Sequence, residues 1–459
     1  MRFSAAELAA DLDGHLQGPD VTLSGLAIDS RLLVPGQLFA AVRGERDGHD
    51  FLAAAMAAGA AAVLVERWEA VPTGGGNGRA GAGDGKGDGK GDMVTAIVVD
   101  DVSAALKQLA RVARRRLPDR VVGVTGSVGK TTAKDLLATV LGRTFVTAAS
   151  QKSFNNEIGV PITLANAPDD TEATVVEMGA RGAGHIEMLC ELARPTVGLV
   201  TTVQNVHTEL MGDLAAIARA KGELVESLPA DGLAVLNADV PLVAAMSQRS
   251  EARVLTFGRA GEVRAREIVI DEELRPSFVL VSPWGEAAVR LSILGEHNVD
   301  NALAAAAVSL GLGVPIEEVA IGLRTASSSP WRMDLRRSPN GLLVLNDAYN
   351  ASPASVVAAL RAAAALPVGE NGRRVAVLGL MAELGEDAPF EHLAVAAVAQ
   401  DLGLQLMAVG TDLYGVEPVA DVETALAELR SGGVGDGDAV LVKGSRVAGL
   451  ERLAALLLE

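Results

Sequence analysis

Two glycines and a lysine, Gly126, Gly129 and Lys130, follow a run of aliphatic residues. Glycines carry no Cβ atom, so backbone N–H groups can close around an anion, and the lysine supplies a positive charge for its outer phosphates. Thr131 adds a hydroxyl for Mg²⁺, and residues 132–141 have the apolar spacing of a helix whose N-terminus faces the phosphates. A glycine-rich turn with a surface lysine is the structural alternative. The strand before the loop and the Lys-Thr-Thr after it favour a phosphate-binding loop of the short form G-x-x-G-K-T-T, which binds ATP or GTP.

Two further polar residues, Glu177 and His207, follow aliphatic strands predicted at 174–177 and 196–202. In an open parallel sheet, ligands gather beyond the carboxyl ends of the strands. Both side chains are therefore expected beside the phosphate-binding loop, where Mg²⁺ can use them. Taken singly, Glu177 could instead pair with an arginine and His207 could cap a helix.

Asn298 and Asn301 open an Ala-rich helix and stand three residues apart, on one face of it. Their amides could read the edge of a base. Capping of the helix by asparagine is the structural alternative.

The last third of the chain alternates strands with helices, which predicts a mostly parallel sheet. Polar clusters at 346–350 and 443–446 follow two of the strands. We expect this edge of the sheet to face the nucleotide across a cleft. The predicted strands are 342–345, 375–378, 404–409 and 439–442.

The first hundred residues contain a helix capped by Ser4 and predicted strands at 23–28 and 61–65. Residues 73–92 are rich in glycine, with aspartate and lysine interspersed, and they cannot bury enough apolar surface to fold. We interpret this stretch as a flexible surface insertion.

Composition limits the possible classes of protein. A chain of 459 residues is long enough for two or three domains, and 49% apolar residues with 3% aromatics fit α/β domains. The net charge of −18 argues against a nucleic-acid-binding protein. The single cysteine, Cys190, excludes an internal disulfide and favours a reducing compartment. The sequence has neither a secretory signal nor an uncharged apolar run of transmembrane length, so we expect a cytoplasmic protein without membrane insertion.

Together these residues resemble the Mur ligase family, from about Asp29 to Arg446. Several motifs occur in the family's order: D-S-R at 29–31, D-G-H-D-F at 47–51, T-G-S-V-G-K-T at 125–131, N-N-E-I-G-V-P at 155–161, E-M-G at 177–179, A-K-G-E at 220–223, N-D-A-Y-N-A-S-P at 346–353 and V-K-G-S-R at 442–446.

The resemblance implies an α/β protein of three domains. A smaller N-terminal α/β domain, residues 1–101, would bind a UDP-muramyl-peptide. Residues 102–326 would form a central P-loop ATPase with a mostly parallel sheet, and residues 327–459 a C-terminal Rossmann-like ligase domain.

The implied reaction joins D-alanyl-D-alanine to UDP-N-acetylmuramoyl-tripeptide with ATP, in the cytoplasmic synthesis of peptidoglycan precursors. ATP would convert the terminal carboxylate into an acyl phosphate, which the amine of the dipeptide attacks. The expected enzyme is a monomer that needs ATP and Mg²⁺.

The resemblance also implies roles for individual residues. The phosphates would be held by Thr125, Gly126, Ser127, Val128, Gly129, Lys130, Thr131 and Thr132. Mg²⁺ would be bound by Thr131, Glu177, His207 and Lys221, with Lys221 carbamylated into an anionic ligand. Asn298 and Asn301 would lie at the adenine, Arg332 at the γ-phosphate and Asp347 near the ribose. The UDP-muramyl-peptide would contact Ser30, Arg31, Asn155 and Asn156, and the dipeptide Asn350 and Ser352.

Two other interpretations remain open at this level. One is another ligase of the same type, which adds the third amino acid or extends a folate with glutamate. The Asp-Asn-Pro segment typical of the third-residue enzyme does not occur in the C-terminal region. The other is a nucleotide-binding scaffold without catalysis. Departures from the family pattern occur at Val128, Met211, Asp213 and Leu380.

Overall fold

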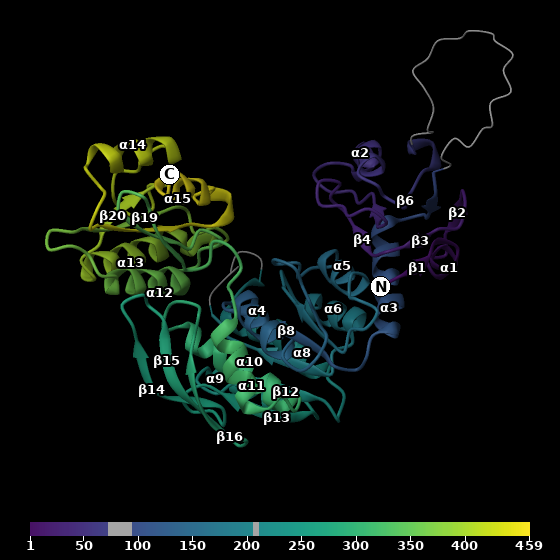
Figure 1. The fold of residues 1–459 in the computed structure, drawn as a ribbon, viewed down its shortest axis with the longest axis horizontal. Helices are drawn as coiled ribbons and strands as arrows, with labels where there is room; N and C mark the ends of the chain where they lie inside the picture. The colour runs from purple at the N-terminus through teal and green to yellow at the C-terminus, as the bar shows by residue number, and fades with distance from the viewer. Residues whose placement is uncertain (72–93, 205–210) are drawn as a thin grey trace, which may run out of the picture. The chain divides into compact units, whose positions relative to one another are not determined.

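The computed structural model describes residues 1–71, 94–204 and 211–459 (Figure 1). The glycine-rich stretch 73–92 and His207 lie outside these ranges. The described chain divides into two compact units. The first contains Met1–Val121, Ala148–Val176 and Met188–Arg194, and the second contains Val122–Thr147, Glu177–Glu187 and Pro195–Glu459. Within the described ranges, no helix is long and apolar enough to cross a membrane.

The first unit contains a five-stranded sheet in the order β2-β7-β6-β5-β4. Its strands pair in parallel except for β2, which runs antiparallel to β7. The strands are β2 (His15–Gln17), β4 (Leu26–Ala27), β5 (Leu38–Ala40), β6 (Ala62–Val65) and β7 (Ala96–Val98). The predicted N-terminal helix is confirmed as α1 (Ala5–Asp11), in which the Ser4 side chain accepts a hydrogen bond from the Glu7 amide.

The strand predicted at 23–28 is wrong as a single element. It is divided into β3 (Thr22–Leu23), which pairs with β1 (Phe3–Ser4), and β4. Gly25 between them has φ +105°, and a Cβ there would lie 2.2 Å from Oδ1 of Asn166. Asn166 accepts from the Leu26 amide and donates to the Leu26 carbonyl, both at 2.8 Å. A side chain distant in sequence therefore bends the chain at a glycine.

The first unit also contains, wholly or mainly, four further α-helices and two further strands. They are α2 (Leu52–Ala57), α3 (Val102–Arg116), β9 (Thr147–Ala149), α5 (Gly159–Ala165), β10 (Ala173–Glu177) and α6 (His185–Ala193). Asn156 caps α5, because its Oδ1 accepts from the Gly159 amide at 2.9 Å.

The second unit contains parallel strands in the order β13-β12-β11-β8. They are β8 (Val121–Thr125), β11 (Val197–Val200), β12 (Leu233–Asn237) and β13 (Arg253–Phe257). The predicted order of strand, glycine loop and helix is confirmed, since β8 leads through residues 126–129 into α4 (Lys130–Leu141). The helices α8 (Leu214–Glu226) and α10 (Asn298–Gly311) complete the surroundings of the loop.

An antiparallel sheet of three strands, in the order β14-β15-β16, was not predicted. Its strands are β14 (Arg264–Ile270), β15 (Pro276–Ser282) and β16 (Gly285–Arg290), and α11 (Ile316–Thr325) packs against β16. Exposed and half-buried residues alternate along β14 except at Arg266 and Glu267, which are both exposed. This period-two alternation is the signal that indicates such strands.

The C-terminal part of the second unit is a sheet in the order β17-β18-β21-β19-β20. All pairs are parallel except β17 with β18, so the predicted parallel sheet is confirmed. Its strands are β17 (Asp334–Arg337), β18 (Leu343–Asn346), β19 (Arg374–Leu378), β20 (Gln405–Ala408) and β21 (Ala439–Lys443).

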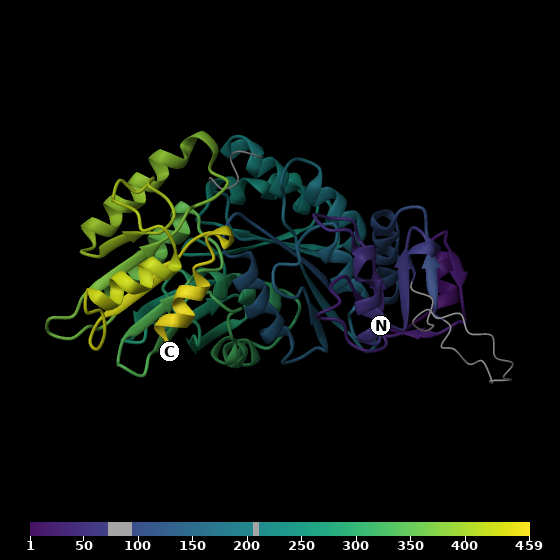
Figure 2. The ribbon, with the colours of Figure 1, turned by 90° about the horizontal axis from the view of Figure 1, so that it is seen from above.

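Helices cover both faces of this C-terminal sheet, each over its own apolar core. One core includes residues of α12 (Pro353–Ala365) and α13 (Ala388–Asp401), and the other includes residues of α14 (Val422–Ser431) and α15 (Glu451–Leu457). Figures 1 and 2 show this layer of strands and helices at the green-to-yellow end of the chain. The three interior strands β18, β21 and β19 are buried on both sides, as their continuous aliphatic runs require.

Candidate active site

The glycines of the loop between β8 and α4 are required by close contacts. Gly126 has φ +149° and Gly129 has φ +87°. A Cβ on Gly126 would lie 2.0 Å from Oγ1 of Thr201, and a Cβ on Gly129 would lie 2.3 Å from Oδ1 of Asn301. Each distance is far below a van der Waals contact, so any side chain would displace the loop.

The end of β11 holds the same loop in place. The Ser127 amide donates to the Thr202 carbonyl at 2.8 Å, and the Val128 amide donates to Oγ1 of Thr202 at 3.0 Å. Thr201 Oγ1 donates to the Val128 carbonyl at 2.7 Å. The bonds at Val128 use its backbone atoms. A valine in place of the small polar residue usual in the family therefore leaves the loop conformation intact. Neither threonine was predicted from the sequence to hold the loop; a polar pair directly after an aliphatic strand was the available signal.

Lys130 starts α4 and folds back over the loop. Its Nζ donates to the Gly126 carbonyl at 2.6 Å and to the Ser127 carbonyl at 3.2 Å. Burial lowers the pKa of Lys130, and the nearby Glu177 carboxylate opposes this shift. Glu177 ends β10 and is 1% exposed. The structure therefore brings the predicted lysine and glutamate within electrostatic reach of each other.

Lys221 on α8 lies behind the loop and is 2% exposed. Its Nζ donates to the Gly126 carbonyl at 3.0 Å, on the oxygen that also accepts from Lys130. Burial and the charge of Lys130 hold the pKa of Lys221 well below its usual range. Both effects disfavour the charged form of Lys221 relative to a lysine in water.

The segment before β17 reaches α4 from the C-terminal part of the unit. Nη2 of Arg332 donates to Oγ1 of Thr131 at 3.1 Å, and its guanidinium lies 4.2 Å from the centre of the Tyr349 ring. Ser329 donates through its amide and its hydroxyl to Oδ2 of Asp135 on α4, at 3.1 and 2.5 Å. The arginine predicted at the γ-phosphate therefore lies beside the loop.

Two strand ends of the C-terminal sheet are joined by a buried ion pair. Nζ of Lys443, at the end of β21, donates to Oδ2 of Asp347 at 2.5 Å and to the Asn350 carbonyl at 2.8 Å. The other oxygen of Asp347 accepts from the Met333 amide at 3.1 Å. Asp347 thereby connects β18, β21 and the segment that carries Arg332.

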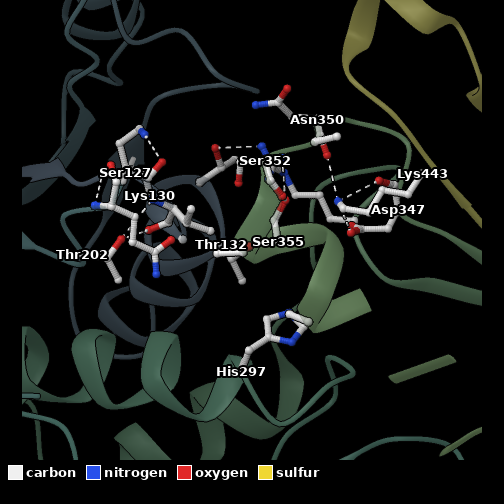
Figure 3. A pocket seen from close by; sticks show the side chains of 18 of the residues that line it. Ser127, Lys130, Thr132, Thr202, His297, Asp347, Asn350, Ser352, Ser355 and Lys443 are labelled. Carbon is white, nitrogen blue, oxygen red and sulfur yellow. Dashed lines mark hydrogen bonds and ion pairs between the residues drawn. The ribbon is translucent and has the colours of Figure 1, made fainter. Parts of the chain in front are cut away.

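Some of these groups line one cavity of about 380 Å³ (Figure 3), whereas Thr125, Gly126, Glu177 and Lys221 are not among its lining residues. In the close-up, Ser127, Lys130 and Thr132 lie on one side, Asp347, Asn350 and Lys443 on the other, and Ser352 and Ser355 between them. The predicted site residues that line it are Ser127, Val128, Gly129, Lys130, Thr131, Thr132, Asn298, Asn301, Arg332, Asp347, Asn350 and Ser352. It is also lined by Lys443, Ser445 and Arg446 of the polar cluster predicted to face the nucleotide, and by His297 and Glu383, for which the sequence predicted no role.

The asparagine side chains of α10 form hydrogen bonds within the protein. Nδ2 of Asn298 donates to the Leu294 carbonyl at 2.6 Å, and Oδ1 accepts from Nδ2 of Asn301 at 2.8 Å. Asn301 in turn lies against Gly129. Their place at the cavity agrees with a nucleotide site, and the contact with adenine stays a prediction.

The residues predicted to contact the UDP-muramyl-peptide belong to the first unit. Arg31 is exposed, and its guanidinium forms a two-bond ion pair with Asp29, at 2.7 and 2.9 Å. Asn156 caps α5, as described above, while Ser30 and Asn155 are half-buried. Their role stays a prediction.

The donor set agrees with a bound nucleotide and Mg²⁺. The loop has the glycine cradle and buried lysine that a triphosphate needs. Among the described residues there is no cluster of three His, Cys, Asp or Glu side chains that would form an all-protein metal site. Mg²⁺ is commonly held by one or two carboxylates together with phosphates and waters, which the hydroxyl of Thr131 and the carboxylate of Glu177 suit.

Three family models match successive parts of the chain. They are described as the Mur ligase family catalytic domain, the Mur ligase middle domain and the Mur ligase glutamate ligase domain, and they match residues 22–114, 124–309 and 331–446.

Curated relatives match over almost the whole length. The UDP-N-acetylmuramoyl-tripeptide–D-alanyl-D-alanine ligase of Mycobacterium tuberculosis is 40% identical, covering 94% of this chain and 91% of the relative. The ligase of the same name from Escherichia coli is 33% identical over 99% and 98% of the two chains.

Solved structures agree with this assignment. MurF from Acinetobacter baumannii has a TM-score of 0.83 and 29% identity, with 100% of this chain and 99% of that chain covered. MurF ligase from Thermotoga maritima, in complex with ADP, has a TM-score of 0.76 and 26% identity over 94% and 96%. The fold is therefore the three-domain α/β architecture with a central ATPase domain of parallel strands and a Rossmann-like C-terminal domain. This chain belongs to the Mur ligase family.

Proposed function

We propose that the chain is an ATP-dependent ligase that adds D-alanyl-D-alanine to UDP-N-acetylmuramoyl-tripeptide in peptidoglycan synthesis. This is the activity in the names of relatives that match it over nearly their full length. The observation that carries the proposal is the cavity itself. It combines a phosphate-binding loop with residues of the C-terminal sheet, so a nucleotide and an acceptor can meet there.

The residues of the chain position two anions for reaction. The carboxylate of the tripeptide and the γ-phosphate repel each other, and Lys130 and Arg332 offset this repulsion. Gly126 and Gly129 let the backbone approach the phosphates closely. The carboxylate attacks the γ-phosphorus with loss of ADP, giving an acyl phosphate, and the dipeptide amine then displaces phosphate and releases a proton. A closed cavity protects the acyl phosphate from water.

Bound Mg²⁺ would add a further positive charge at the transferred phosphate. Thr131 and Glu177 are the residues that we propose to hold it, and His207 completes the predicted set outside the described residues. We also propose that Lys221 becomes a carbamate: its neutral amine adds to CO₂ and releases a proton, which converts the lysine into an anionic ligand. The lowered pKa of Lys221 supports this step because only the neutral amine reacts.

The remaining assignments belong to the same proposal. Ser30, Arg31, Asn155 and Asn156 contact the UDP-muramyl-peptide, and Asn350 and Ser352 the dipeptide. The domains span residues 1–101, 102–326 and 327–459. The enzyme works as a cytoplasmic monomer.

The test is release of ADP and phosphate with Mg²⁺-ATP, the UDP-linked tripeptide and D-alanyl-D-alanine, with each omitted in turn. We expect release that requires both organic substrates and a UDP-linked pentapeptide identified by its mass. Turnover with a single amino acid or a folate would contradict the named acceptor. No turnover with any acceptor would support a nucleotide-binding scaffold.

A further inference from the structure

Arg332 stands between two residues whose backbone is left-handed. Trp331 has φ +62° and Met333 has φ +49°. Residues other than glycine adopt this conformation only where neighbouring contacts impose it. The backbone of this segment is therefore held in a conformation that its own residues do not favour, and the charged side chain that it presents to the cavity is Arg332.

The polar segment that follows β18 supplies the contacts that hold this backbone. The Tyr349 amide donates to the Trp331 carbonyl at 3.1 Å, and the Met333 amide donates to Oδ1 of Asp347 at 3.1 Å. The two bonds fix the chain on both sides of Arg332. They do not fix the direction of its side chain.

The guanidinium of Arg332 forms one hydrogen bond with the described residues. Its Nη2 donates to Oγ1 of Thr131 at 3.1 Å, whereas its Nε is buried without a hydrogen-bond partner in the described part of the chain. Burial lowers the pKa of Lys130, and the charge of Arg332 adds to this shift, which means that the two cations repel each other. A further contact is therefore needed to keep Arg332 beside the loop.

The ring of Tyr349 provides this contact. The guanidinium carbon of Arg332 lies over the ring, 4.2 Å from its centre. Arginine stacks on aromatic rings because their negative face attracts its charge, and the attraction is larger where water is excluded. Arg332 lines the cavity, and Tyr349 is not among the lining residues. The ring thus contacts the guanidinium without lining the space for a ligand.

We propose that Tyr349 is a positioning residue, whose ring holds the guanidinium of Arg332 beside the phosphate-binding loop for contact with the γ-phosphate. The inference rests on the proposed function, in which Arg332 offsets the charge of that phosphate. It goes further by giving a role to Tyr349, for which the sequence predicted none, and by assigning that role to the ring rather than to the hydroxyl.

The test measures binding of two nucleotides with Mg²⁺ by calorimetry, so it does not depend on turnover. β,γ-Imido-ATP has a γ-phosphate, and ADP lacks it. We expect Tyr349→Leu to weaken binding of the imido analogue roughly 3- to 30-fold, as loss of a partly desolvated cation–π contact should, and to leave ADP binding unchanged. Tyr349→Phe keeps the ring and should bind both nucleotides as wild type does.

A double-mutant cycle tests whether Tyr349 acts through Arg332. Arg332→Ala should weaken binding of the imido analogue, and Tyr349→Leu added to it should cause no further loss. Phe390→Leu is the matched control, because Phe390 on α13 is 72% exposed and is not among the residues that line the cavity. This control should bind both nucleotides as wild type does.

Several results would overturn the proposal. One is an equal loss of affinity for ADP and for the imido analogue in Tyr349→Leu, which would indicate a general disturbance of the site. Others are a defect of the same size in Tyr349→Phe, or losses that multiply in the double variant. Unchanged binding of the analogue in either single variant, Tyr349→Leu or Arg332→Ala, would overturn it as well.

Failure of the ligase function itself is recognised separately. If wild type binds the imido analogue but does not turn over the dipeptide, the ligase is rejected, and the binding measurements still decide the role of Tyr349. If wild type turns over the dipeptide and Tyr349→Leu binds the analogue as wild type does, only the inference about Tyr349 is wrong.

Discussion

At the scale of single residues, the contact between Gly129 and Asn301 gives the first prediction. Gly129→Ala combines a left-handed φ with a Cβ placed 2.3 Å from Oδ1 of Asn301. We expect this variant to raise KM for ATP at least tenfold, because the loop must move away from the position that holds phosphates. The strain alone should cost about 1–2 kcal/mol of stability. Kinetics with varied ATP and urea unfolding measure the two effects.

Two other glycines provide controls for this substitution. Gly184 has φ +78°, and a Cβ added there would have no atom within 4 Å, so Gly184→Ala introduces strain without a clash. Gly182 has no positive φ, and an added Cβ there would also have no atom within 4 Å, so Gly182→Ala introduces neither strain nor a clash. Gly184→Ala should therefore lose stability but keep its KM for ATP, and Gly182→Ala should change neither. An ATP-binding defect of equal size in Gly184→Ala would mean that the Asn301 contact is not the cause.

The glycines and the lysine of the phosphate-binding loop could be predicted from the sequence, whereas the residues that hold the loop in place could not. Gly126, Gly129 and Lys130 stand in a pattern whose chemistry is contained within a few residues. Thr202 holds the loop from a strand more than seventy residues later in the chain, and nothing in its own neighbourhood indicates this partner. Contacts of this kind depend on the order of strands in the sheet, which short-range patterns do not specify.

At the scale of elements, the loop at 379–384 between β19 and α13 depends on one buried histidine, because Nε2 of His392 accepts a hydrogen bond from the Met381 amide at 3.0 Å. His392→Leu would leave the Met381 amide buried without its acceptor, which costs about 1–3 kcal/mol. His392→Gln can place its Oε1 near the position of Nε2 and restore the bond. We expect His392→Leu to lower the free energy of unfolding, and His392→Gln to reverse part of this loss. Equal defects in the two variants would show that ring packing, rather than the hydrogen bond, determines the loop.

The same histidine predicts a dependence of stability on pH. Burial lowers the pKa of His392 below its ordinary value of 6.5. The unfolded chain therefore binds more protons than the folded chain just below that pH, so stability is complete above 6.5 and falls as the pH decreases toward the lowered pKa. Urea unfolding between about pH 5 and 7.5 should show this loss in wild type. A wild-type loss that His392→Gln reproduces in full would exclude His392 as its source.

Elements with a strong periodic pattern were predicted, and those determined by distant contacts were not. The four parallel C-terminal strands were each found within one or two residues of their predicted positions, whereas the antiparallel β17, which contains a single aliphatic residue, was not predicted. The strand at 23–28 has a suitable pattern too, but Asn166 binds Leu26 and the chain bends at Gly25. The antiparallel strands between 264 and 290 have six or seven residues, but β14 and β16 are largely exposed and rich in polar residues, so their hydrophobic signal is weak.

At the scale of the whole molecule, net charge and local charge have opposite signs. The chain carries a net charge of −18, yet in the lining of the cavity the cations Lys130, Arg332, Lys443 and Arg446 outnumber the carboxylates Asp300, Asp347 and Glu383. Composition was sufficient to argue against nucleic acid as a partner. It could not predict a basic cavity, because the four cations come from three separate parts of the sequence.

The proposed domain boundary at residue 327 gives the last prediction. One apolar core of the C-terminal sheet lies entirely between Leu342 and Leu458, and the other draws only Leu274, Leu294 and the adjoining Ile270 from earlier in the chain. A segment of residues 327–459 should therefore fold by itself, with a cooperative urea transition followed by circular dichroism.

A shorter segment tests whether the complete C-terminal sheet is required for this independent folding. Residues 347–459 lack β17 and β18, and β18 is an interior strand that pairs with both β17 and β21. Removing it exposes one edge of β21 and takes Leu343, Val344 and Leu345 out of the two apolar cores, so this segment should not show a cooperative transition. If residues 327–459 were also unfolded, the contacts of Leu274 and Leu294 would be essential to the C-terminal core. The boundary would then lie earlier in the chain, before β14.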